Sequence, residues 1–258
     1  MLWKFYKNDP ELCSYIFGTM HLSTNEAYTY TDVAKKYIKT VSVYAAEMDL
    51  NDSKDIQMMQ YFLLSEGQIF SSFFRPKQYQ KYRNTILKSY KVDIQNFENY
   101  TPFFINNYLA ELTLCKSESE PLDHYLWSYA LSLGKELTGV ESLHDQLQIL
   151  KSIPLDFQIK SFKDSVKNLK AFRKKITTLN LLYKKGEVQT LYRITKKSMG
   201  KIRKLMIYDR NERMAKTTIE IHEKRPCFVA VGAAHLGGRK GVLSLLKKSG
   251  YKVKEVKQ

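Results

Sequence analysis

The sequence contains few cysteines and no long apolar run, and these two shortages exclude whole classes of protein. Its three cysteines, Cys13, Cys115 and Cys227, lie far apart. This spacing excludes a disulfide framework and a CxxC metal site. No stretch approaches the roughly 18 consecutive apolar residues of a membrane-spanning helix. The HExxH sequence is also missing, so the chain is not an ordinary zinc protease of that type.

The N-terminal sequence MLWKFYKNDP lacks the apolar segment and the small-residue cleavage site of a signal peptide. From this we expect a cytoplasmic protein, or a periplasmic or secreted one whose leader has been removed. An apolar content of 43% over 258 residues is enough for a sizeable core. We therefore expect a single domain over residues 1–258.

Acidic residues are scarce between residues 160 and 216, a segment that contains 18 Lys and Arg but only 4 Asp and Glu. The whole chain has a net charge of +16, which could attract nucleic acid, anionic lipid or an acidic substrate. The lysines nevertheless recur at a helical spacing that is typical of a solvated face, and no nucleic-acid-binding motif accompanies them. The sequence therefore does not favour a nucleic-acid partner. The lysines in question are Lys160, Lys163, Lys167, Lys170 and Lys174.

The two ends of the chain carry the patterns of strands. Cys13–Met20 and Val41–Met48 are apolar, and they flank a segment in which about 12 residues should form a helix. This strand–helix–strand order predicts a βαβ unit with parallel, adjacent strands. Near the C-terminus, Cys227–Val231 predicts another buried strand and Tyr251–Val256 an edge strand.

The middle of the chain is predominantly helical. It contains a short strand near 136–140, and one long helix is predicted from Pro154 to about residue 185. The sequence thus predicts an α/β (α+β) fold with a mixed, partly parallel sheet. That sheet is built from residues 1–51 and 226–258, and a large helical insertion occupies residues 52–225.

Two segments share an order of residues that places a histidine just beyond a strand. SYIFGTMHLS and FVAVGAAHLGG both have an apolar run, a glycine, two further residues and then His21 or His235. Ligands of open parallel sheets bind beyond the carboxyl ends of the strands. We therefore expect the two strands to be neighbours and both imidazoles to face one cleft, as metal ligands or as a base.

Charged residues stand in two further apolar contexts. Glu47 ends an apolar strand, where a carboxylate must be paired, hydrogen-bonded or bound to metal. Glu141 follows the predicted strand near 136–140, although it could instead cap the next helix. Arg210 shares an approximate helical face with Met206 and Met214, so its guanidinium either reaches solvent or pairs with a buried anion such as Glu47 or Glu141.

The ordered motifs of the chain resemble those of the TraB/GumN family. They are GTMHL, a Glu at the end of the next strand, LDHYLWSYALSLGKELTGVESLHDQL, YDRNERMA and FVAVGAAHLGGRKGVLSLLKKSGYKVKEV, spread over about residues 2–256. The family includes bacterial pheromone-shutdown proteins and the animal TIKI proteases. The resemblance implies an erythromycin-esterase-like or ChaN-like α/β core and a TIKI-like metalloprotease that uses a divalent metal, with manganese or cobalt favoured. The site residues that it implies are His21, Glu47, Glu141, Arg210, Asn211 and His235, and Asp123 and Gln146 match recurrent positions.

These observations predict a hydrolase that cleaves a peptide or a related amide. His21, Glu47 and His235 would hold the metal, one glutamate would act as general base, and Arg210 would stabilise an oxyanion or orient a carboxylate. Asn211, the neighbour of Arg210, is added to the site. Two alternatives keep the same residues: a metal-independent esterase-like hydrolase, and a haem- or metal-binding protein in which a histidine is an axial ligand.

Overall fold

The computed structural model describes residues 1–20, 24–51, 58–114 and 120–256. Contacts divide the chain into two compact units. Unit 1 comprises Met1–Asp55, Lys116–Gln146 and Leu179–Gln258, and unit 2 comprises Ile56–Cys115 and Leu147–Thr178. Unit 1 contains all six strands of the sheet.

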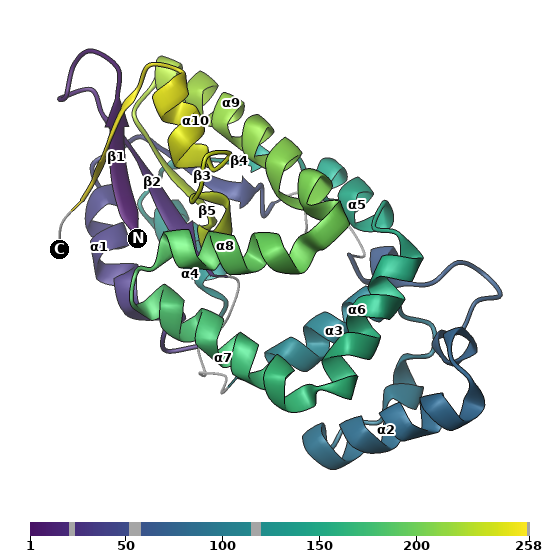
Figure 1. Cartoon of the computed structure of the whole chain (residues 1–258). Coiled ribbons are helices and arrows are strands. Elements are labelled where there is room, and N and C mark those ends of the chain that lie inside the picture. Colours follow the sequence, from purple (N-terminus) through teal and green to yellow (C-terminus); the bar gives the residue numbers. More distant parts are fainter. Residues whose placement is uncertain (21–23, 52–57, 115–119, 257–258) are drawn as a thin grey trace. The chain divides into compact units, whose positions relative to one another are not determined.

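Unit 1 is built on a mixed six-stranded sheet with the order β4-β3-β5-β2-β1-β6 (Figure 1). The four strands β4, β3, β5 and β2 are parallel, whereas β1 pairs antiparallel with both β2 and β6. The expected α/β fold with a mixed, partly parallel sheet is confirmed. The strands are β1 (Leu2–Tyr6), β2 (Ser14–Thr19), β3 (Val43–Met48), β4 (Glu136–Glu141), β5 (Cys227–Gly232) and β6 (Lys252–Glu255).

The composition of the strands follows from their places in the sheet. All six residues of β5 are buried, because this strand lies between two parallel neighbours and has helices on both faces. A continuous apolar run is what such a strand requires. The edge strand β6 alternates lysines with Val253 instead, and three of its four residues are exposed.

Helices cover both faces of the sheet. Successive side chains of a strand point to opposite faces, and β2 shows which helices lie on each. Ser14 bonds to His222 on α9, while the ring of Tyr15 packs 4.6 Å from that of Tyr37 on α1. The helices α1 and α4 therefore cover one face, and α9 and α10 the other (Figure 1). Their bounds are α1 (Thr31–Ile38), α4 (Leu122–Ser132), α9 (Asp209–Lys224) and α10 (Val242–Lys248).

The adjacency expected for the βαβ unit is wrong. The strands β2 and β3 run parallel, but β5 from the far end of the chain lies between them. Three residues of β3 pair with β5 in register, starting with Val43 opposite Cys227. The local pattern predicted parallel strands correctly, but it could not reveal that a segment about 180 residues away would pair between them. The N-terminal strand β1 was not predicted.

Unit 2 is helical and has an aromatic core. Phe70 and Phe162 are fully buried, and their rings meet edge to face at 5.0 Å. Buried Ile86 and Ile105 belong to the same core. The helices that lie in unit 2 are α2 (Pro76–Tyr90), α3 (Pro102–Glu111) and α6 (Leu155–Lys167).

The long helix predicted from Pro154 is wrong as a single element, because the chain forms α6 and a separate helix, α7 (Leu169–Lys184). Asn168 lies between them with φ −128° and ψ 62°. Its side-chain oxygen accepts a hydrogen bond from the backbone N–H of Ala171. Asparagine competes with helix propagation in this way and is a favoured N-cap, which explains the break.

Three further helical elements connect those already described. The helix α5 (Leu143–Lys151) follows β4, and α8 (Val188–Met199) precedes a π-helical turn, Lys204–Tyr208, that leads into α9. A π-helical turn changes the phase of the helix after it. The fully buried residues of α9 are accordingly Asn211, Met214 and Thr218, whereas Met206 is only partly buried. The single helical face expected for Met206, Arg210 and Met214 is therefore corrected, because Met214 alone of the three is fully buried.

Candidate functional site

The candidate site lies at the carboxyl ends of the parallel strands. Glu47 is the penultimate residue of β3, Glu141 is the last residue of β4, and Gly232 is the last residue of β5. His235 ends a 3-10 turn that directly follows β5. Because parallel strands end at one edge of a sheet, these side chains meet at the edge where such folds bind ligands.

A single guanidinium joins the two carboxylates. Arg210 donates from Nη2 to Glu47 Oε1 at 2.5 Å and to Glu141 Oε2 at 2.6 Å, and from Nε to Glu141 Oε2 at 2.9 Å. The three side chains are 12%, 10% and 0% exposed, respectively. The expected contact of Arg210 with Glu47 and Glu141 is confirmed. Arg210 does not extend into solvent, and the Glu141 carboxylate binds guanidinium groups instead of capping the next helix.

The charges in this cluster stabilise one another. Burial alone would lower the pKa of Arg210, but the carboxylates of Glu47 and Glu141 raise it above its ordinary value. A buried charge is tolerated only when paired and hydrogen-bonded, so the three groups are interdependent. A buried cluster of charges with a shifted pKa is typical of a functional site.

Glu47 and Glu141 have additional donors. Glu47 Oε2 accepts the backbone N–H of Gly232 at 2.9 Å, which links β3 to the end of β5. Gln146 on α5 lies between the carboxylates, with Nε2 3.5 Å from Glu47 Oε1 and 3.4 Å from Glu141 Oε2. Arg213 Nη2 lies 3.3 Å from Glu141 Oε1. The position of each carboxylate is thus determined by at least two other elements.

Asn211 determines the tautomer of His235. Its Nδ2 donates to the carbonyl of Lys240 at 2.7 Å, so its Oδ1 faces Nδ1 of His235 at 2.6 Å. An amide oxygen only accepts, so Nδ1 of His235 carries the hydrogen. A neutral imidazole then has its lone pair on Nε2, which is the arrangement of a metal ligand or of a base. Asn211 is fully buried and His235 is 9% exposed.

Gly18, three residues before His21, permits close packing beside the turn that carries His235. A Cβ added to Gly18 would lie 3.0 Å from Leu236 Cδ1 and 3.1 Å from Ala233 Cβ, which is tighter than ordinary contact. The absence of a side chain therefore lets the end of β2 approach the turn that carries His235. The strands before His21 and His235 are paired neighbours, as expected, with Thr19 opposite Gly232. His21 itself lies outside the described residues.

The structure brings six of the expected residues together at the ends of β3, β4 and β5. They are Glu47, Glu141, Arg210, Asn211, Gln146 and His235.

The structure places Asp123 elsewhere. It is buried on α4, which lies on the opposite face of the sheet from α9. Arg213 was not identified from the sequence. Residues three positions apart are neighbours on the surface of a helix, so the spacing of Arg210 and Arg213 could have identified Arg213.

The part of the chain that the structure describes contains no group of three or more His, Cys, Asp or Glu arranged to hold a metal. The donor types nevertheless fit a divalent metal. The tautomer of His235 leaves the lone pair on Nε2, and a carboxylate such as Glu47 accepts several bonds at each oxygen. The third expected ligand, His21, is not among the described residues.

Comparison with known proteins identifies the family. The model of the TraB/PrgY/gumN family matches residues 1–255. The chain belongs to this family. It is 23% identical to the metalloprotease TIKI2 of Danio rerio and 25% identical to the metalloprotease TIKI1 of Xenopus tropicalis, in each case over 98% of the chain. It is also 22% identical to a metalloprotease TIKI homolog of Nematostella vectensis, over 99% of the chain.

The chain spans about 60% of the length of the first two of these relatives and 67% of the third. No solved structure matches it. Among the described helices, none combines the length and the apolar character needed to cross a membrane.

Proposed function

We propose that the protein is a metal-dependent hydrolase, a TIKI-like peptidase that cleaves a peptide or a related amide. The observation that carries this proposal is the orientation of His235 by Asn211, beside the Glu47–Arg210–Glu141 cluster. A histidine whose Nδ1–H bonds to a fixed acceptor is how proteins orient a metal ligand. The similarity to TIKI metalloproteases supports the same chemistry.

His21, Glu47 and His235 would hold the metal, with manganese and cobalt as the ions to test first. When bound, a divalent metal supplies an activated water and polarises the scissile carbonyl. The similarity in sequence supports the presence of such a metal, and the choice of ion is part of the proposal.

The two glutamates have different environments, which suggests different roles. The side chain of Glu141 is fully buried, and both of its carboxylate oxygens accept from guanidinium groups, those of Arg210 and Arg213. We therefore assign it the role of holding Arg210 in place. We assign proton transfer or metal ligation to Glu47, which meets both Arg210 and the end of β5.

Arg210 would bind a substrate oxygen. Its Nε and Nη2 groups contact the carboxylates, and a guanidinium has further N–H donors on Nη1. With the guanidinium held by two carboxylates, those donors would be preorganised for a carboxylate or for a developing oxyanion. Asn211 would act indirectly, as a positioning residue for His235.

The test combines metal content with activity. Protein purified without chelator should contain a divalent metal, and it should cleave members of a peptide library. Activity should be lost with chelator, should return with manganese or cobalt, and should be absent in His21→Ala and His235→Ala proteins that remain folded. Full peptidase activity in metal-free protein would favour the esterase-like alternative. A Soret band on mixing with haem, without hydrolysis, would favour the haem-binding alternative.

A further inference from the structure

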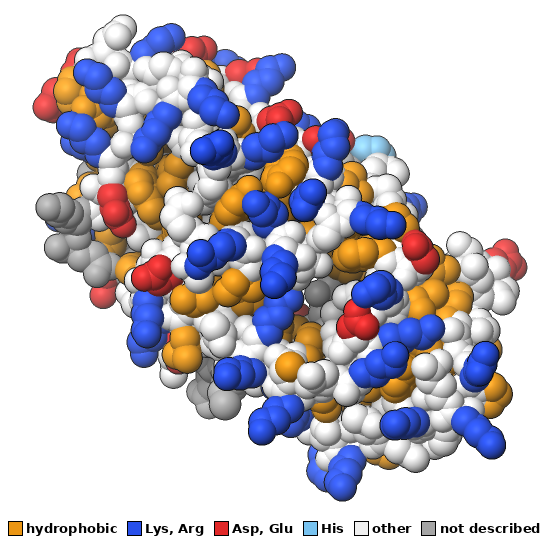
Figure 2. Space-filling model, in the orientation of Figure 1, with side chains coloured by type: hydrophobic (Ala, Val, Ile, Leu, Met, Phe, Trp, Pro, Cys, Tyr) orange, Lys and Arg blue, Asp and Glu red, His pale blue; other side chains and the backbone are white. Residues whose placement is uncertain are grey.

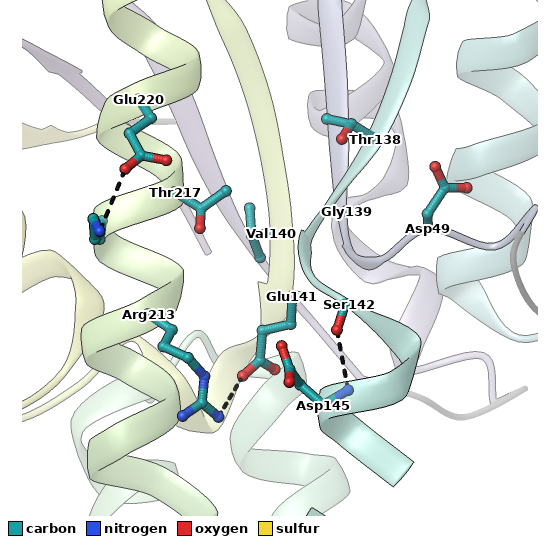
Figure 3. Close-up of a pocket in the computed structure, with 11 residues that line it drawn as sticks. Asp49, Thr138, Gly139, Val140, Glu141, Ser142, Asp145, Arg213, Thr217 and Glu220 are labelled. Carbon is teal, nitrogen blue, oxygen red and sulfur yellow. Dashed lines mark hydrogen bonds and ion pairs between the residues drawn. The ribbon is translucent and has the colours of Figure 1, made fainter. Parts of the chain in front are cut away.

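A cavity of about 460 Å³ lies within unit 1 between β4 and α9 (Figure 3). On the β4 side it is lined by the consecutive residues Thr138, Gly139, Val140 and Glu141. A cavity over the face of a sheet would be lined by alternate residues, because successive side chains point to opposite faces. The run of consecutive residues indicates that the cavity follows the outer edge of β4.

This edge has no partner strand among the described residues. The strand β4 stands first in the sheet order and pairs only with β3 on its inner side. An edge strand presents a row of backbone N–H and C=O groups that can pair with another chain. Extended peptides bind such edges by strand addition, in which main-chain hydrogen bonds supply affinity.

The opposite wall of the cavity is one face of α9. Arg213, Lys216, Thr217 and Glu220 line it, and their spacing of three, four and seven residues places them on the same side of a helix. Figure 3 shows Arg213 reaching Glu141, and Thr217 on α9 and Val140 on β4 line the same cavity. These side chains offer two cations, a carboxylate and a hydroxyl, so this wall suits a polar peptide more than an apolar ligand.

Glu141 connects this cavity to the candidate site. It lines the cavity, its Oε1 meets Arg213, and its Oε2 meets Arg210, which also holds Glu47. A chain lying along β4 would therefore reach the carboxyl end of the strand beside the Glu47–Arg210 pair. The groove and the site share a wall, as a substrate subsite and its reaction centre would.

We propose that β4 receives an extended peptide segment as an added strand, in the groove formed by the edge of β4 and the Arg213–Glu220 face of α9. This inference rests on the proposed function, since the bound segment is part of the peptide substrate. The backbone of the segment pairs with β4, and alternate side chains face α9.

Backbone N-methylation tests the pairing. The probe is the tightest-binding fluorescein-labelled octapeptide from a random library, and binding to the His235→Ala protein is measured by fluorescence anisotropy so that cleavage does not interfere. In an added strand every second N–H faces the partner strand, so single N-methyl groups should weaken binding at alternate positions. We expect about tenfold or more at those positions and little change between them.

A matched pair of variants tests the location. Thr217→Trp places a large side chain in the groove and should weaken binding about tenfold or more. Glu212→Trp places the same side chain at an exposed position of α9 outside the groove and should leave binding unchanged. Urea unfolding of both variants establishes that each is folded.

The outcomes separate this inference from the proposed function. Alternate-position effects together with loss of binding in Thr217→Trp support the groove even if the wild type cleaves nothing. If the wild type cleaves peptides but N-methylation shows no alternating effect on binding, the groove is overturned and the hydrolase proposal stands. Equal binding by the two tryptophan variants has the same consequence. Failure of every octapeptide to bind also overturns the groove.

Discussion

Asn211 and His235 form a buried pair in which the amide sets the protonation of the imidazole. The 2.6 Å contact between Asn211 Oδ1 and His235 Nδ1 has only one direction, because Nδ2 of Asn211 is already used by the carbonyl of Lys240. Replacing the amide by Leu should remove the acceptor and reduce activity or metal affinity about 10- to 100-fold, with the fold retained. Steady-state kinetics and metal titration measure this, and unchanged values in Asn211→Leu would contradict the positioning role.

Asn211→Asp makes a sharper test of the same pair. The carboxylate still accepts from Nδ1, but its negative charge favours the imidazolium and should raise the pKa of His235. Protonated imidazole neither ligates nor acts as a base, so the acidic limb of the pH–rate profile should move to higher pH. A profile of kcat/KM against pH that keeps its acidic limb in place would show that His235 does not titrate in the reaction.

Arg210→Lys tests the planar geometry of the cluster. Lysine keeps the charge but loses the fork that spans Glu47 and Glu141, so turnover should fall at least about tenfold. The readout is kcat of the folded variant. Turnover equal to that of the wild type would reject a role for Arg210 in catalysis.

Arg210→Met tests the energetic interdependence of the cluster. The substitution leaves two buried carboxylates without their shared cation and should lower the free energy of unfolding by about 3–5 kcal/mol. Arg83→Met is the matched control, because the Arg83–Asp93 pair is more exposed, at 29% and 24%. The control should lose much less stability than Arg210→Met, because solvent screens an exposed ion pair, and urea denaturation compares the two. Equal losses in the free energy of unfolding would show that the buried cluster stabilises the fold no more than an exposed ion pair does.

His222 predicts a pH dependence of stability. Burial lowers its pKa in the folded protein, with a smaller opposing effect of Glu223. The unfolded chain then binds a proton before the folded one does, so stability should fall as pH drops below about 6.5 toward the lowered pKa. The ring packs between Phe5 and Tyr251, so His222→Phe preserves an aromatic ring without a titrating group.

Urea denaturation of the wild type and of His222→Phe at pH 7 and pH 5 isolates this contribution, because the other histidines are common to both proteins. The variant should lose less stability over this range than the wild type. An identical pH dependence of the two proteins would exclude His222 as the source.

The lysines of α6 and α7 lead to a prediction about nucleic acid. Four of the five lysines expected on a solvated face, Lys160, Lys167, Lys170 and Lys174, are exposed, whereas Lys163 is partly buried. Lys and Arg side chains are also spread over the face seen in Figure 2, with apolar groups between them. Nucleic-acid binding should therefore be weak and should fall steeply between 50 and 200 mM salt, on the order of 10³-fold if about six phosphates are contacted. Anisotropy at several salt concentrations measures this slope, and tight, sequence-selective binding at physiological salt would contradict it.

The sequence alone was enough to predict most strands and to single out Glu47, Glu141 and His235, which the structure brings to the same edge of the sheet. A fully apolar run such as Cys227–Val231 indicates a buried strand, and the alternating Tyr251–Val256 indicates an edge strand. A glutamate at the end of an apolar strand is costly without a partner, so Glu47 could be identified before its partner was visible.

Tertiary structure decided what pairs with what. The place of β5 between β2 and β3, and the meeting of Arg210 with Glu47 and Glu141, depend on contacts between residues 69 to 213 positions apart. Local patterns indicated Glu47 and Glu141 as possible partners of Arg210, but they could not show that one guanidinium binds both carboxylates or that β5 separates β2 from β3. The π-helical turn before α9 likewise changed which residues face the core, and it brought Asn211 to a fully buried position opposite His235. Composition and periodicity predict whether a side chain is buried. Which partner a buried polar group contacts depends on how the strands and helices of the whole sheet pack together.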